Sequence, residues 1–256
     1  MSKRLLTMLL SSGLIAGFLS CNQCIAATDG MVNFSSKGVS FSYPMSMGGK
    51  FSSKKVAAFP LPSPDDKPDD VAPEHWEITF AKSNAHIYVF PTSDPKVKDF
   101  KKSYPTVADA TKDLTSLLTN KSAAPTNIPF LPWMDASTPI NSHVKYVNFK
   151  GGSGVRYIAT YQIEPEVVSN DGLLYSMQGL TTDGKHFESA MIPITSKTLP
   201  AKSPVATWSK EKYDAFSKDF ANYSKKEEAK LNKLADSAFS PSIADLDKII
   251  ESIKVQ

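Results

Sequence analysis

The chain has 256 residues, of which 41% are hydrophobic and 21% are charged. This composition excludes an intrinsically disordered protein and allows one large packed domain. The formal net charge is +3, and without residues 1–27 the chain holds 27 basic and 26 acidic residues. A nearly neutral chain lacks the positive field of a nucleic-acid binder, so the sequence predicts no nucleic-acid partner.

The N-terminus has the pattern of a bacterial export signal. Lys3 and Arg4 precede the apolar residues 5–19, and the small residues at 26–27 suit cleavage after position 27. We therefore expect residues 1–27 to be a signal peptide and residues 28–256 to form a single domain that is periplasmic or secreted. The alternative is an outer-membrane lipoprotein cleaved before Cys21, because the residues before this cysteine resemble a lipoprotein box. Membrane contact would then come from the N-terminal lipid alone.

Two β-hairpins are predicted in the first part of the chain. Residues 31–34 and 39–43 alternate apolar and polar side chains on either side of a turn, and residues 75–80 and 86–90 do the same. Between the hairpins, the prolines of residues 59–70 indicate an irregular surface loop. Four aspartates of this loop could bind calcium, but they lack the spacing of an EF-hand, so a hydrated loop is favoured; they are Asp65, Asp66, Asp69 and Asp70.

A helix is predicted after Pro105, because apolar residues recur there at spacings of three and four; they are Val107, Ala110, Leu114, Leu117 and Leu118. The next apolar run, residues 128–134, contains two prolines and cannot be a regular helix. It is too hydrophobic to lie freely in water, so we expect it to pack as a plug or to line a groove.

The most regular alternation in the chain lies between Val144 and Ile194. Residues 155–163 alternate with period two, and residues 145–149 form a partner strand across the glycine-rich turn at 151–154. Extended runs follow at 173–178 and 186–194, joined by a turn that contains Asp183-Gly184. The pattern predicts a four-stranded antiparallel meander, and the apolar face that carries Tyr157 needs a cover.

Two amphipathic helices are predicted near the C-terminus. The first runs from Trp208 to about Ala235, and the second carries isoleucines and a leucine at helical spacing between Ile243 and Ile253. The segment 201–256 is expected to pack on the sheet or to be appended to it. The predicted fold class is therefore α+β, with mainly antiparallel sheet of about eight strands covered by an inserted helix and two C-terminal helices.

Arg156 is the best candidate for an anion-binding residue. It is the one arginine outside residues 1–27, against 26 lysines, and it lies inside the most regular strand. An arginine is expected where a planar, bidentate fork is needed for a carboxylate or a phosphate. Two interpretations remain open: a structural ion pair across strands with Glu188 or Asp183, and the binding of an anionic ligand.

His186 and Glu188 share one face of a predicted strand, because they are two residues apart. They could ligate a metal, but no third ligand follows at a zinc-site spacing, so a surface or core pair is favoured and no metal or cofactor is predicted. Tyr157 and Gln178 belong to an aromatic and polar set that could stack on a sugar or a peptide, although high strand propensity is the favoured explanation. No catalytic or phosphate-binding motif is found.

The run from Tyr146 to Tyr157, followed by Gln178 to Gly184 and Pro193, resembles a group of exported bacterial proteins of uncharacterised function. This resemblance implies no catalytic residues. The segment Gly38–Pro44 also resembles the start of domains with the PsbP/Mog1-like α/β sandwich fold. That resemblance implies a non-catalytic binding or accessory role.

These observations favour an exported bacterial envelope protein that works as a non-enzymatic binding or accessory domain, with a small ligand or an envelope protein as partner. The alternative is an exported hydrolase or carbohydrate-active enzyme. Its site would lie near Arg156, His186 and Glu188, and Arg156, Tyr157, Gln178, His186 and Glu188 are together the candidate binding residues.

Overall fold

The computed structural model describes residues 30–36, 38–58, 73–93, 106–134 and 136–255. The predicted signal peptide, Cys21 and the aspartates of the 59–70 loop lie outside the described residues.

The main element is a seven-stranded sheet in which every neighbouring pair is antiparallel. The strand order is β3-β4-β5-β9-β8-β7-β6. The predicted meander is confirmed as β6 to β9, and the second predicted hairpin as β4 and β5. The strands are β3 Phe51–Val56, β4 His75–Phe80, β5 His86–Pro91, β6 Ser137–Phe149, β7 Gly152–Gln162, β8 Leu174–Thr181 and β9 His186–Pro193.

The first predicted hairpin forms, but in a separate small sheet. β1 (Met31–Ser36) pairs with β2 (Val39–Pro44), and β2 pairs with β12 (Lys254–Val255), so the two ends of the described chain meet. The short strands β10 (Thr195–Ser196) and β11 (Phe239–Ser240) pair with each other.

The predicted inserted helix is α1 (Val107–Asn120), and Thr106 begins it with a capping box that includes Asp109. The C-terminal helices are α2 Lys210–Lys218, α3 Phe220–Leu231 and α4 Ile243–Ser252. The described residues also form short 3-10 helices, namely η1 Met45–Met47, η3 Val205–Thr207 and η4 Asp236–Ala238.

The prediction of one continuous helix from Trp208 to about Ala235 is wrong. Asp219 leaves the helical conformation, with φ −102° and ψ 10°, and it both ends α2 and precedes α3. Its side chain accepts a hydrogen bond from Asn222 Nδ2 at 2.6 Å. Aspartate has a lower helix propensity than lysine, glutamate or alanine, which favours a helix boundary over a helix interior at this position.

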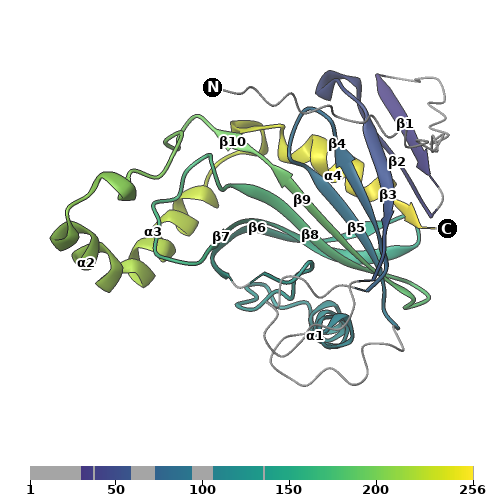
Figure 1. The fold of residues 1–256 in the computed structure, drawn as a ribbon, viewed down its shortest axis with the longest axis horizontal. Coiled ribbons are helices and arrows are strands. Elements are labelled where there is room, and N and C mark those ends of the chain that lie inside the picture. The colour runs from purple at the N-terminus through teal and green to yellow at the C-terminus, as the bar shows by residue number, and fades with distance from the viewer. Residues whose placement is uncertain (1–29, 37, 59–72, 94–105, 135, 256) are drawn as a thin grey trace, which may run out of the picture.

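The two faces of the large sheet are covered by different elements, as Figure 1 shows. On one face, α1 and residues Ile128 and Leu131 bury the side chains of Val155, Tyr157 and their neighbours. On the other face, α4 and the small sheet form a larger core. The predicted α+β class with a mainly antiparallel sheet is confirmed, and the predicted cover of the Tyr157 face is α1. No helix among the described residues is long and apolar enough to cross a membrane.

Candidate functional site

Arg156 lies on β7 and points to the face that α4 covers. Its Nε donates to Asp247 Oδ1 at 2.9 Å and its Nη2 donates to Oδ2 of the same carboxylate at 3.2 Å. Arg156 is only 5% exposed and Asp247 only 6%. The predicted need for a bidentate partner is met, but the predicted partners Glu188 and Asp183 are wrong, because the carboxylate comes from α4.

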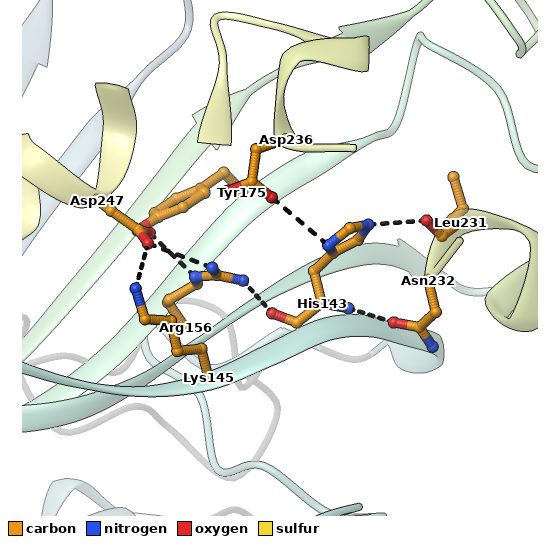
Figure 2. A network of polar contacts seen from close by, with 8 residues as sticks. All are labelled: His143, Lys145, Arg156, Tyr175, Leu231, Asn232, Asp236 and Asp247. Carbon is orange, nitrogen blue, oxygen red and sulfur yellow. Dashed lines mark hydrogen bonds and ion pairs between the residues drawn. The ribbon is translucent and has the colours of Figure 1, made fainter. Parts of the chain in front are cut away.

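The Asp247 carboxylate accepts two further hydrogen bonds, from Lys145 Nζ and from the Tyr175 hydroxyl, each at 2.9 Å (Figure 2). Burial acts to raise the pKa of Asp247, but the hydrogen bonds from Lys145 and Arg156 outweigh it and hold the pKa below its usual range. Asp247 is therefore a charged acceptor whose oxygens are fully engaged by the sheet.

His143 extends this network to the end of α3 (Figure 2). It has a left-handed φ of 51°, where β6 shifts register just before Lys145. Its carbonyl accepts from Arg156 Nη1, its backbone N–H donates to Asn232 Oδ1 at 2.6 Å, and its Nε2 lies 2.7 Å from the Leu231 carbonyl. At the bulge, the network therefore joins the sheet to both α3 and α4.

Tyr157 and Gln178 point to the opposite face, toward α1, and both are fully buried. The Tyr157 hydroxyl is 3.0 Å from that of Tyr161. Gln178 accepts from the Leu131 backbone N–H at 3.2 Å and donates to Ser189 Oγ at 3.1 Å. These side chains hold the proline-rich run against the sheet, and their polar groups are already paired within the core.

Glu188 is fully buried, and neither of its carboxylate oxygens has a hydrogen-bond partner. On the neighbouring strands it lies beside Val89 and Gly179. Burial raises its pKa to about 8. Arg156 and the partly exposed His186 share this face with Glu188, but the Arg156 guanidinium is occupied by Asp247. The five predicted residues therefore divide between two faces and do not form one site.

A cavity of about 610 Å³ lies where β7 runs past the start of β8. Sequence reasoning missed it, although most of its lining lies within residues 160–172, because the way this stretch folds back beside β7 has no periodic pattern. One wall is the end of β7, the opposite wall is the loop before β8, and the spacer before α2 contributes to the rim. The residues that line it include Thr160, Tyr161, Gln162, Ile163, Glu166, Ser169 and Asp171.

The charged residues that line this cavity are Glu164, Glu166, Asp171 and Lys202. Three acids against one lysine give the cavity a net negative charge. All four side chains are on exposed residues, so their field is screened by salt but reaches an approaching ligand. The cavity therefore favours a cation over an anion.

Two side-chain oxygens of residues that line the cavity have no hydrogen-bond partner among the described residues. They are Thr160 Oγ1 and Gln162 Oε1, both covered from solvent. Buried polar groups are normally paired, and an unpaired one costs about 1–3 kcal/mol. Because both atoms are covered, they destabilise the wall of the cavity and are not acceptors for a ligand bound in it.

A second cavity, of about 710 Å³, lies between α1 and the start of β6. The apolar run 128–134 was expected to act as a plug or to line a groove, and it does both. Ile128 and Leu131 are buried in the α1 core, while Phe130 and Trp133 line the cavity. Phe130 also packs edge-on against Tyr161, with ring centroids 5.0 Å apart.

Among the described residues, no group of three His, Cys, Asp or Glu side chains is arranged to hold a metal ion. No family model matches the sequence. No curated protein matches it either. Among solved structures, the chain is similar to PsbP (CyanoP) from the cyanobacterium Synechocystis sp. PCC 6803. The identity is 10%, over 96% of this chain and 98% of that one, with a TM-score of 0.30. A likeness at this TM-score is too weak to carry an argument.

Proposed function

We propose that this chain is an exported bacterial envelope protein that acts as a non-enzymatic binding domain. Its site is the cavity at the end of β7, and its ligand carries a positive charge. The observation that carries the proposal is the net negative charge of the cavity, which Glu164, Glu166 and Asp171 give it against Lys202. An ammonium or guanidinium group offers both the charge and the hydrogen-bond donors that these exposed carboxylates accept.

The hydrolase alternative has less support. Its three residues are Arg156, His186 and Glu188, and none of them lines either cavity described above. A catalytic group must be within reach of a bound substrate. The pKa of Glu188 is raised, as that of a general acid often is, but its side chain is fully buried inside the core.

The ligand class is tested by two-dimensional NMR of the mature protein titrated with n-butylammonium, with butyrate and butanol at the same concentrations. We expect n-butylammonium to shift the amide signals of residues 160–172 in a saturable way, and the other two probes to leave them unchanged. The variant that neutralises the three cavity acids should lose the response; its substitutions are Glu164→Gln, Glu166→Gln and Asp171→Asn.

The matched control neutralises three exposed acids outside the cavity, by Glu74→Gln, Asp183→Asn and Glu251→Gln. It should retain the wild-type response, because the total charge changes equally but the cavity does not. Equal shifts with butyrate, or a response that survives in the cavity variant, would contradict the proposed site.

The location is tested by native mass spectrometry of the protein purified from the envelope of its own host. A chain that begins at Thr28 supports a periplasmic or secreted protein. A mass that carries lipid on Cys21 supports the lipoprotein alternative. A chain that retains residues 1–27 without modification would contradict export.

A further inference from the structure

β7 extends beyond its partner on one side. The register between β7 and β8 ends at Ala159 opposite Leu174. On the other side, β6 continues to pair with Thr160 and Gln162. The last residues of β7 therefore form a strand whose outer edge, the edge toward the cavity, is paired with no strand among the described residues.

The backbone of Tyr161 points to this free edge. Gln162 pairs with Ser137 of β6, and its carbonyl accepts a hydrogen bond from the Ser137 hydroxyl at 3.0 Å, so it faces β6. Backbone groups of successive residues in an antiparallel strand point to opposite edges. The N–H and C=O of Tyr161 therefore face the cavity, where they are available to an added strand.

The loop opposite this edge is held away from it. The Val168 N–H donates to the Tyr223 hydroxyl of α3, and the Asn170 N–H donates to the Pro200 carbonyl, both at 2.9 Å. The Asn170 side chain also bridges to Ser196, whose N–H donates to Asn170 Oδ1 at 2.8 Å. Because these anchors lie on α3 and on the spacer, the loop does not close the gap beside β7.

Two groups of side chains beside the free edge of β7 determine which kind of ligand the cavity favours. The acids Glu164, Glu166 and Asp171 favour a basic residue, as argued above. Ile163 lines the same cavity and is 85% exposed, so it offers an apolar contact beside the acids. An extended peptide presents alternate side chains to opposite faces, so a sequence that alternates basic and β-branched residues meets both features.

We infer that the cavity binds an extended, basic segment of a partner protein, which adds to the free edge of β7 as an extra strand. The inference rests on the proposed function, because it names the class of ligand for the same site. Backbone hydrogen bonds to Tyr161 fix the register, and the acids of the loop select basic side chains. This is strand addition to an open sheet edge, in which the main chain contributes affinity and alternate side chains contribute specificity.

The test uses the peptide acetyl-Val-Lys-Val-Lys-Val-amide and the same mature protein. One analogue is N-methylated on the central valine, and a second is N-methylated on both lysines. Alternate amides of a bound strand face opposite edges, so one set of amides pairs with β7 and the other faces solvent. The analogue whose methyl groups lie on the amides that pair with β7 loses one hydrogen bond. We expect it to bind about tenfold more weakly than the analogue whose methyl groups face solvent.

Hydrogen exchange of the Tyr161 amide gives an independent readout. Saturating peptide should slow it by about tenfold or more, because the N–H becomes paired and covered. The peptide with glutamate in place of both lysines should not slow it. The amide of Gln162, which faces β6, serves as the internal control and should be unaffected.

The outcomes separate the two proposals. If the parent peptide and both analogues bind equally and Tyr161 exchange is unchanged, strand addition is wrong, while the cation-binding site stands. If n-butylammonium binds and the peptide binds no better, the ligand is a small cation and the inference is again wrong. If neither probe binds, the proposed function and the inference both fail.

Discussion

Arg156 on β7 and Asp247 on α4 are separated by 91 positions in the chain, yet they form a bidentate ion pair that is almost completely buried. Lys145 and Tyr175 complete the coordination of the same carboxylate. The pair fastens the last helix, α4, to β7, the strand next to the edge strand β6 of the large sheet. The one arginine outside residues 1–27 thus has a structural partner, and an external anion is not needed to explain it.

Arg156→Lys is expected to destabilise the protein by about 2 kcal/mol, because one ammonium group cannot replace the planar fork. Thermal denaturation measures the effect as a lower melting temperature. The control is Lys145→Ala, which removes a half-exposed partner of the same carboxylate and should cost less than about 1 kcal/mol. An unchanged melting temperature for Arg156→Lys would show that the pair is not structural.

Asp247→Asn leaves the Arg156 charge buried without a counterion, which should cost about 3–5 kcal/mol. Arg156→Met combined with Asp247→Asn removes that charge, so the double variant should lose less stability than the sum of the two single variants. Urea denaturation of the four proteins in the cycle measures the coupling. Strict additivity would mean that the two residues do not act as a pair.

Glu188 should make the protein less stable as the pH rises from about 5 to 8. Its pKa is raised from 4.5 to about 8 by burial, so in this range the folded state binds a proton that the unfolded state releases. Each pH unit in the window then costs about 1.4 kcal/mol, and the total is on the order of 4 kcal/mol. Below pH 4.5 the carboxyl is protonated in both states and this cost disappears.

Glu188→Gln has nearly the same shape and does not titrate. Its free energy of unfolding should exceed that of the wild type by a margin that grows between pH 5 and 8 and is absent at pH 4. Urea denaturation at pH 4, 6 and 8 measures this difference, and the comparison cancels the titration of other groups. A margin that is the same at all three pH values would contradict the raised pKa.

Gly152→Ala should destabilise the protein by about 1–3 kcal/mol, because an added Cβ overfills a packed site. That Cβ would lie 2.2 Å from the Phe149 ring and 2.4 Å from the Leu180 carbonyl oxygen, which belongs to the backbone and cannot rotate away. Gly172→Ala is the control, since nothing lies within 4 Å of its Cβ position. Thermal denaturation should give a lower melting temperature for Gly152→Ala than for Gly172→Ala. Equal melting temperatures would contradict the close packing of β7 against β8.

Thr160→Val should raise the melting temperature of the ligand-free protein, because it removes a buried hydroxyl that has no partner. Thr181→Val is the matched control. The Thr181 hydroxyl donates to Asp183 Oδ1 and accepts from the His186 N–H, so its removal should lower the melting temperature. A loss of stability in Thr160→Val would mean that its hydroxyl has a partner in solution.

The elements that the sequence predicted correctly are those whose signal is local. The period-two pattern of residues 155–163 marked β7, and the spacing of Val107, Ala110 and Leu114 marked α1. β3 was missed, because Phe51–Val56 has one buried residue and polar neighbours, and its pairing with β4 decides its conformation. The boundary at Asp219 was missed because an apolar stripe continues on both sides of it.

The sequence by itself determined the class of the fold, the order of most strands and the need for a bidentate partner of Arg156. Only the tertiary structure decided that this partner is Asp247, that Glu188 is buried without one, and that the edge of β7 is free beside an acidic cavity. The physical reason is that periodicity and turn chemistry act between neighbouring residues. The Arg156–Asp247 pair and the burial of Glu188 depend on which distant segments pack together, and the cavity depends on how residues 160–172 fold back beside β7; no periodic pattern records either.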